Sequence, residues 1–502
     1  MPFRRSVPLC LAVVAITSSL TGCKHFRRQA EQQKQVQKAV VAKANAKPKV
    51  EPLGPPIDTA NDLAYRIFQR TGATGMVAVV VRGDETWMAG YGHVSPADHT
   101  TPQADTLFRL CSISKILATD LLSKLVAEKK MALDDPLQKY APKDITVPTM
   151  TVRGPADRPV ELIDLATHTA GMPREIAYPP QGAAHFTFPD FNYRWQWLPQ
   201  YRMRSQPGTA AHYSNIGFDL LGDAIASASG MTYLQFFQQE TAKPLGLKNT
   251  TLTPSADQCS RLMGGQHEPI ECTDTQAAAG SGGMYSTATD MSKVLRYFLD
   301  LPGVPVHANE LATQTVIDPA SLRSIQGLGH AGLPDGIGLG WIEINKDYGP
   351  SRIVQKTGGG AGFQTYIALN PARHAGIFLA RTDGRRGGGN MFREGNDMLL
   401  AMVGLPPVPE DENDPERELT AAELRAANAK VRGIRHGRAA TRAAEKARTK
   451  AVPPRAAKPA RTTAKRAAVA TKHTAAPTRR STTARRSTAA KKPATTPHRK
   501  RR

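Results

Sequence analysis

The chain has 502 residues, which is enough for more than one domain, and its apolar content of 40% can supply a core. The net charge of +23 is unevenly distributed, because residues 425–502 hold 25 Lys and Arg against one acid, Glu445. That tail therefore carries +24, and the other 424 residues sum to −1. The basic balance belongs to the tail, so it indicates no polyanion-binding role for the rest of the chain.

The N-terminus has the pattern of an export signal. Arg4 and Arg5 precede the apolar run "VPLCLAVVAITSSL", which is too short to span a membrane and fits a lipoprotein signal peptide over 1–22. The overlapping "LTGC" resembles the bacterial lipobox, in which the cysteine, here Cys23, is acylated and begins the mature protein. By the same resemblance Lys24 favours the outer membrane, so we expect a lipid-anchored protein of the periplasm. The alternative is an unprocessed signal with a chance cysteine.

Composition divides the remainder into four parts. Residues 23–56 are charged, rich in Gln and end in prolines, which predicts a flexible tether after the lipidated cysteine. Residues 57–408 are predicted to form the globular catalytic domain, and 409–424 an acidic, proline-containing linker. The tail, 425–502, contains no aromatic residue. It cannot bury enough apolar surface to offset chain entropy, so it is predicted to be disordered.

The globular domain begins and ends with patterns that are typical of strands. In chain order we expect a helix over 59–71, a β-hairpin over 75–92, a helix over 112–129, a loop- and helix-rich middle, three strands over 352–384 and a helix over 388–404. Strands at both ends with helices between them imply one sheet built from distant segments. We therefore predict an α/β fold (an α+β sandwich) with a central antiparallel sheet flanked by helices, and a helical insertion domain.

Three short motifs point to nucleophilic chemistry. Ser112 and Lys115 form S-x-x-K at the start of a predicted helix, Tyr213 and Asn215 form Y-x-N, and Lys356 begins K-T-G. S-x-x-K alone occurs by chance in a chain of this size, but all three motifs in this order would be a rare coincidence. The combination predicts an acyl-transfer site.

Each residue type suits a step of that chemistry. A serine hydroxyl needs a base within hydrogen-bond reach, and Ser112 and Lys115 share one face of a helix whose N-terminus favours developing negative charge. A second cation, Lys356, would lower the pKa of a buried Lys115 and make it a proton acceptor. Tyr213 can relay the proton to a leaving amine, and Asn215 can hold a substrate amide.

The K-T-G motif suits substrate binding. Lys356 and Thr357 would meet a carboxylate, the first as a charge and the second as a hydroxyl donor. Gly358 and Gly359 would let a strand edge approach the substrate closely. The backbone N–H groups of Ser112 and Gly359 would then form an oxyanion hole.

The cysteines are interpreted separately. Cys111 is interpreted as a small buried residue and not as the nucleophile, because Lys115 lies three residues after Ser112 and so shares a helix face with the serine. In an oxidising compartment Cys259 and Cys272 are candidates for a disulfide. Their alternative, a zinc site, needs more ligands than "DQCSRLMGGQHEPIEC" offers, so no metal is expected.

The motifs and their order, with "LATHTAGMPRE" and "AAGSGGMYSTATDM", resemble the penicillin-binding-protein and class C β-lactamase superfamily. The resemblance covers 57–404 and is strongest to D-alanyl-D-alanine carboxypeptidase/endopeptidases of that superfamily. It implies that Ser112 is the acylated nucleophile, that Lys115 and Tyr213 are the acid/base pair, and that Lys356 binds a carboxylate.

The resemblance also bears on the cysteines and on one histidine. A cysteine pair of the family matches Cys259 and Cys272, which implies the disulfide. Cys111 departs from the family, which usually carries Ala or Gly at this position. His168, within "LATHTAG", is interpreted as a structural residue that fixes a loop below the site.

We therefore expect a serine D-alanyl-D-alanine carboxypeptidase/endopeptidase that acts on peptidoglycan stem peptides through an acyl-enzyme on Ser112, binds β-lactams and needs no cofactor. The alternatives are a class C-like β-lactamase or esterase, and a non-catalytic lipoprotein that tethers the cell wall. Membrane attachment is expected through Cys23. The basic tail is expected to bind peptidoglycan or anionic lipid, and export makes nucleic acid an unexpected partner.

Overall fold

The computed structural model describes residues 54–150, 158–177, 187–267, 270–383 and 389–409. The predicted signal peptide, Cys23, most of the tether, almost all of the linker and the whole basic tail lie outside these residues. Among the described residues, no helix combines the length and the apolar character that a membrane crossing requires.

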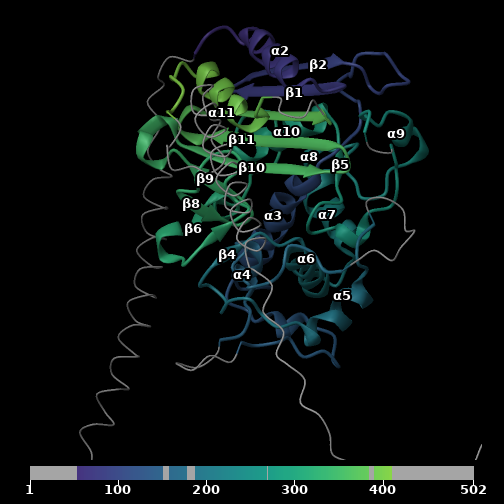
Figure 1. The fold of residues 1–502 in the computed structure, drawn as a ribbon, viewed down its shortest axis with the longest axis vertical. Helices are drawn as coiled ribbons and strands as arrows, with labels where there is room; N and C mark the ends of the chain where they lie inside the picture. Colours follow the sequence, from purple (N-terminus) through teal and green to yellow (C-terminus); the bar gives the residue numbers. More distant parts are fainter. Residues whose placement is uncertain (1–53, 151–157, 178–186, 268–269, 384–388, 410–502) are drawn as a thin grey trace, which may run out of the picture. The chain divides into compact units, whose positions relative to one another are not determined.

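An antiparallel sheet forms the centre of the described part of the chain, with eight strands in the order β2-β1-β12-β11-β10-β9-β8-β6 (Figure 1). The strands are β1 (Gly75–Arg82), β2 (Glu85–Gly92), β6 (Thr315–Ile317), β8 (Gly336–Gly338), β9 (Ile342–Ile344), β10 (Ile353–Gly360), β11 (Phe363–Asn370) and β12 (Ala375–Thr382). Because β1 pairs with β12, the two ends of the domain meet within one sheet, next to the edge strand β2. The predicted fold class, with its central antiparallel sheet, is confirmed.

Each face of the sheet is covered by helices. Alternate residues of β1 point to opposite faces, as the period of two in a strand requires. Val77, Val79 and Val81 join a core with residues of α3 (Ser114–Ala127) and α10 (Ala288–Phe298). Met76, Ala78 and Val80 join a second core with α2 (Thr59–Thr71) and α11 (Met391–Met402). The sheet is thus buried on both sides, which explains why β1 is a continuous apolar run.

The helix-rich middle of the chain packs on α3. Its helices are α4 (Leu162–Ala166), α5 (Phe191–Trp197), α6 (Asn215–Ser229), α7 (Tyr233–Phe237), α8 (Lys243–Leu245) and α9 (Ala256–Ser260). Two short ladders accompany them, β3 (Phe108–Arg109) with β5 (Tyr285–Ser286) and β4 (Ala211–His212) with β7 (Ile325–Gln326). In Figure 1, α3 lies between the sheet and α6, and most of its residues are buried. A helix buried on all sides can hold a reactive side chain away from bulk water.

Most predicted elements are present, with two differences. The helix predicted over 112–129 is α3, but it starts at Ser114 and is preceded by a 3-10 turn, η1 (Cys111–Ile113). The short strands from β3 to β9 were not predicted, because two or three residues are too few to show a period. The first difference matters chemically, since Ser112 lies in the turn.

Candidate active site

The turn that carries Ser112 is held by its neighbours on both sides. The N–H of Leu110 donates to the carbonyl of Met284 over 2.8 Å, and the N–H of Met284 donates to Ser114 Oγ over 3.1 Å. On the sheet side, Thr365 Oγ1 donates to the carbonyl of Leu110 over 2.8 Å. These contacts fix the backbone before and after the serine, so the position of its hydroxyl is set by tertiary structure.

Cys111 lies in the same turn with a φ of +50°, a left-handed conformation that favours glycine. The side chain is buried, and Sγ donates a weak hydrogen bond to the carbonyl of Gly360 over 3.4 Å. Burial raises the pKa of the Cys111 thiol to about 12. Since the thiolate is the nucleophilic form, a thiol that stays protonated is a poor nucleophile beside Ser112.

Lys115 is completely buried, and its ammonium has three oxygen partners. Nζ lies 3.3 Å from Ser112 Oγ, 2.6 Å from Asn215 Oδ1 and 2.6 Å from the carbonyl of Ser281. Burial lowers the pKa of Lys115, while the buried carboxyl of Asp219 opposes this shift. A lysine with a depressed pKa, in hydrogen-bond reach of a serine, is a suitable general base.

Tyr213 approaches the serine from the other side. Its hydroxyl donates a hydrogen bond to Ser112 Oγ, so this oxygen lies between a phenol and an ammonium. Three cations lie close to the Tyr213 ring, with Lys115 Nζ, Arg174 Cζ and Lys356 Nζ at 4.8, 5.0 and 5.1 Å from its centroid. The site is therefore strongly electropositive and favours an anionic substrate group or transition state.

His168 packs against the ring of Tyr213. The two rings stack with centroids 4.5 Å apart, and His168 Nδ1 accepts the N–H of Ser214 over 3.0 Å. Burial, reinforced by the neighbouring cations, places the pKa of His168 well below its usual value, so the ring stays neutral. This arrangement agrees with the structural role that we expected for His168.

The K-T-G motif lies on β10, next to the turn η1. Lys356 is buried, and burial, reinforced by Lys115 and Arg174, lowers its pKa to about 8. Thr357 is half-buried, whereas Gly359 is exposed and lines the cavity above the serine. The strand thus brings Lys356 to the Tyr213 ring and the bare backbone of Gly359 to the cavity, whereas Lys356 and Thr357 are not among the residues that line the cavity.

A cavity of about 250 Å³ opens over Ser112. Its lining includes Ser112, Asn215 and Ser281 on one side, Gly359 on another, and Arg174 and Glu175 at the rim. Polar groups that converge on a concave space beside a nucleophile are typical of a substrate-binding site.

Asn215 is engaged more fully than the sequence indicated. Its Oδ1 accepts from Lys115 Nζ, and its Nδ2 donates to a carboxylate oxygen of Glu175. Its backbone N–H donates to the carbonyl of Arg174 over 2.9 Å. The amide that we expected to hold substrate therefore also links the lysine to the rim of the cavity.

Four residues of the site were not predicted. Arg174 and Glu175 lie within "LATHTAGMPRE" and Ser281 within "AAGSGGMYSTATDM", so the resemblance reached these stretches without selecting the residues. Asp219 follows Asn215 by one helical turn on α6. Only the spacing of four residues between Asn215 and Asp219 could have drawn attention to this buried carboxyl.

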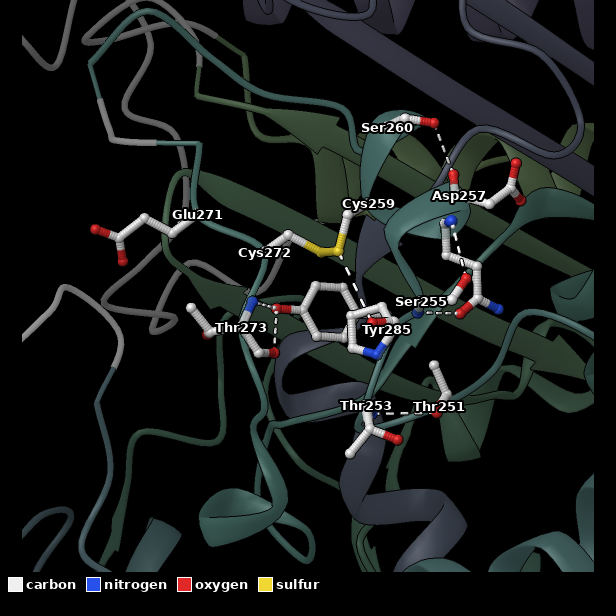
Figure 2. Close-up of a disulfide and its surroundings, with 12 residues drawn as sticks. Thr251, Thr253, Ser255, Asp257, Cys259, Ser260, Glu271, Cys272, Thr273 and Tyr285 are labelled. Atoms are coloured by element: carbon white, nitrogen blue, oxygen red, sulfur yellow. Dashed lines mark hydrogen bonds between the residues drawn. A yellow bond between two sulfur atoms is a disulfide. The ribbon is translucent and has the colours of Figure 1, made fainter. Parts of the chain in front are cut away.

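A disulfide joins Cys259 and Cys272, next to the strand that braces the nucleophile turn (Figure 2). The N–H of Thr273 donates to the Tyr285 hydroxyl over 3.2 Å, and this hydroxyl donates back to the carbonyl of Thr273 over 3.1 Å. Tyr285 follows Met284, which contacts the turn. The disulfide therefore stabilises a segment that ends at the active site.

Comparison with known proteins agrees with this geometry. Residues 49–397 match the family described as Beta-lactamase. The D-alanyl-D-alanine-carboxypeptidase/endopeptidase AmpH of Escherichia coli K12 is 38% identical over 356 residues, which are 70% of this chain and 90% of that protein.

Solved structures give the same result. A crystal structure of the β-lactamase/D-alanine carboxypeptidase of Yersinia pestis, complexed with citrate, has a TM-score of 0.65 and 36% identity and covers 70% of this chain and 100% of its own. A class C β-lactamase of Rhodobacter sphaeroides, 24% identical with a TM-score of 0.53 and coverage of 69% and 99%, is similar in fold. With a family match over most of its length and a relative this similar, the chain belongs to the beta-lactamase family, as the sequence motifs predicted.

Proposed function

We propose that the protein is a serine D-alanyl-D-alanine carboxypeptidase and endopeptidase that cleaves peptidoglycan stem peptides and is acylated by β-lactams. The observation that carries the proposal is the placement of Ser112 Oγ between Lys115 Nζ and the Tyr213 hydroxyl. The relative AmpH, whose name states both peptidase activities, supports this substrate class.

The geometry supports a two-step acyl transfer. Neutral Lys115 accepts the Ser112 proton while Oγ attacks the carbonyl of the D-Ala-D-Ala bond. The N–H groups of Ser112 and Gly359 stabilise the oxyanion, and Lys356 binds the terminal carboxylate. The proton passes through Tyr213 to the leaving amine, which is D-Ala in the carboxypeptidase reaction and the cross-linking amine in the endopeptidase reaction. Water then attacks the ester, releases the shortened peptide and returns the proton to Ser112.

The test compares the protein with a Ser112→Ala variant on purified pentapeptide and cross-linked muropeptides, with products identified by chromatography and mass spectrometry. Loss of one D-Ala, or splitting of dimers, only when Ser112 is present would support the proposal and give the balance of the two activities. Rapid hydrolysis of a β-lactam without peptide turnover would instead assign a β-lactamase. Inertness toward both substrates would favour the non-catalytic tethering role.

We also propose that the protein is a periplasmic lipoprotein anchored through Cys23, most simply in the outer membrane. The support is the lipobox-like "LTGC" after a short apolar run, with Lys24 next to it. Mass spectrometry of the mature N-terminus tests this, since acylation should disappear in a Cys23→Ser variant. Membrane fractionation of the same pair tests the location, and an unacylated, freely soluble wild type would contradict it.

The tail of 425–502 is proposed to bind peptidoglycan or anionic lipid through its charge of +24. Such binding is electrostatic and should weaken with salt. Pull-down with purified sacculi and with vesicles containing anionic lipid, at low and high salt, distinguishes the two partners. Equal binding with and without residues 425–502 at low salt would refute a role for the tail.

A further inference from the structure

Asp219 connects to the active-site lysine through a single residue. It lies on α6, one turn after Asn215, and only 4% of the residue is exposed. Its Oδ1 accepts the N–H of Ser281 over 3.1 Å, and the carbonyl of Ser281 accepts from Lys115 Nζ over 2.6 Å. The carboxyl and the lysine therefore bind the two backbone groups of one residue. Asn215 and Asp219 lie on the same face of α6. Besides Ser112 Oγ, Lys115 contacts two oxygens: Asn215 supplies the first, and Asp219 holds the residue that supplies the second, Ser281.

Burial shifts the pKa values of Asp219 and Lys115 in opposite directions. It raises the pKa of Asp219 and lowers the pKa of Lys115, whereas the attraction between the two charges favours ionisation of both. The other groups around Lys115 are Glu175 and Arg174 at the cavity rim, Cys111 of η1, Lys356 of β10, and His168 and Tyr213. The other groups around Asp219 are Arg194 of α5, Asp223 of α6 and Tyr233 of α7.

The hydrogen bonds that Arg194 donates go to groups other than Asp219. Its guanidinium is committed to Asp223 by two hydrogen bonds, of 2.5 and 2.6 Å. Two further donors of Arg194 reach the carbonyls of Pro189 and Ala277, over 2.9 and 2.8 Å. The charge of Arg194 still favours the ionised form of Asp219, more strongly than the charge of Lys115 does. The Asp219 carboxylate accepts its hydrogen bond from the Ser281 N–H, which is the contact that leads to Lys115.

We propose that Asp219 is a positioning residue for acyl transfer, which aims the Ser281 carbonyl at Lys115 and controls when Lys115 releases its proton. The catalytic part rests on the proposed function, because it takes Lys115 as the base for Ser112. Asp219 is not among the residues that line the cavity over Ser112. Its negative charge favours the protonated form of Lys115. Its carboxylate oxygen accepts the Ser281 N–H and so positions the Ser281 carbonyl, which accepts from Lys115.

Two variants separate these effects. Asp219→Asn keeps an oxygen for the Ser281 N–H and removes the charge, whereas Asp219→Ala removes both. The first measurement is the titration of the Lys115 side chain by NMR on ¹³C-lysine-labelled protein, with the signal assigned by a Lys115→Arg variant. The second is the pH dependence of Ser112 acylation by a penicillin. Both use the full chain, and thermal unfolding checks that each variant folds.

In Asp219→Asn the Lys115 titration should move to lower pH by about one unit, because the negative charge that favours protonated Lys115 is lost. Burial raises the pKa of Asp219, so acylation should be faster, by up to about tenfold, only at pH values where wild-type Asp219 is ionised and Lys115 is still protonated. In Asp219→Ala the maximal acylation rate should also fall, by about tenfold, because the Ser281 N–H loses its acceptor. Unchanged Lys115 titration in a folded Asp219→Asn protein would overturn the proposal, whether or not the protein is acylated. Failure of the wild type to be acylated would instead refute the proposed function, and the NMR titration would still decide the link between Asp219 and Lys115.

The matched control is Asp290→Asn. Asp290 is also buried, and it accepts backbone N–H bonds from Lys248 and Asn249 over 3.2 and 2.7 Å. Its hydrogen bonds among the described residues do not include Lys115 or Ser281. The Asp290→Asn variant should have a lower thermal stability, and its Lys115 side chain should titrate at the same pH as in the wild type. An equal shift in both asparagine variants would show a general effect of buried charge and would overturn the specific role of Asp219.

Discussion

Gly358 lies against the backbone of Ser112. A Cβ at position 358 would overlap Thr365 Oγ1 most closely, and it would lie 2.8 Å from the Leu110 carbonyl oxygen and 3.2 Å from the Ser112 nitrogen. The absence of a side chain therefore lets β10 reach the nucleophile turn. At Gly359 the nearest atom to such a Cβ is the Phe363 carbonyl oxygen, 3.8 Å away, so an alanine would fit.

Gly358→Ala should therefore destabilise the protein by about 1–3 kcal/mol through overpacking and slow acylation by displacing Ser112. Gly359→Ala should change stability by less than about 0.5 kcal/mol. Denaturant unfolding and acylation by a labelled penicillin measure both effects. Gly359→Ala is a control for stability only, because Gly359 lines the cavity and its N–H is assigned to the oxyanion hole. An equal change of stability in the two variants would mean that β10 does not pack against the turn as described.

Tyr213→Phe should slow acylation by about 10² to 10⁴, because the hydroxyl that donates to Ser112 Oγ and relays the proton is lost. Stability should change little, since the ring and its stacking on His168 remain. The control is Tyr201→Phe, which removes a hydroxyl that donates to the Gly171 carbonyl over 3.1 Å, outside the contacts of Ser112. Comparable acylation loss in both variants would contradict the role of Tyr213.

Lys356 predicts a pH effect on substrate binding. Its pKa is lowered to about 8, so the ammonium loses its proton as pH rises through that value. KM for a peptide with a free terminal carboxylate should increase above about pH 8. The increase should be absent for the same peptide as an amide, and it should disappear in Lys356→Arg, because arginine remains charged. A KM that is flat with pH for the free carboxylate would show that Lys356 does not bind it.

The disulfide should contribute about 3 kcal/mol to the free energy of unfolding, as expected for a loop of 13 residues. A Cys259→Ala, Cys272→Ala double variant, or reduction of the wild type, should lower stability by this amount in denaturant unfolding. The rate of acylation of the folded protein should change little, because Met284 still contacts the turn. The double variant also provides the control for reduction, since a reducing agent should not destabilise it further.

Cys111 should be inert in the native protein. Because burial raises its pKa to about 12, alkylating reagents should label it only after unfolding. Cys111→Ala should retain acylation within about threefold, since Ser112, Lys115 and Tyr213 are unchanged. Intact mass spectrometry after exposure to penicillin measures this. Loss of the adduct in a folded Cys111→Ala protein would identify the thiol as a participant.

Local patterns were sufficient for the elements whose own residues repeat over many positions. The helical period of α2 and the two apolar runs of β1 and β2 around a turn predicted these elements closely. The pairing of Ser112 with Lys115 followed from their spacing of three residues. The order of the motifs was enough to indicate the family. The strands β6, β8 and β9 could not be predicted, since their pairing depends on neighbours brought by the sheet and not on a period of their own.

The protonation chemistry of the site was decided by tertiary structure alone. The acceptor that Ser281 offers Lys115 is a backbone carbonyl, which every residue type possesses, so no sequence pattern marks it. Nothing in the position of Asp219 on its helix marks it as unusual. It influences Lys115 because the fold brings its carboxylate to the N–H of Ser281, 62 positions away in sequence. Burial and long-range contacts shift the charges of Lys115 and Asp219, and both depend on how distant segments pack. The residue types and their spacing could be read along the chain, whereas packing sets the charges of Lys115 and Asp219, because burial and contacts between distant segments shift their pKa values.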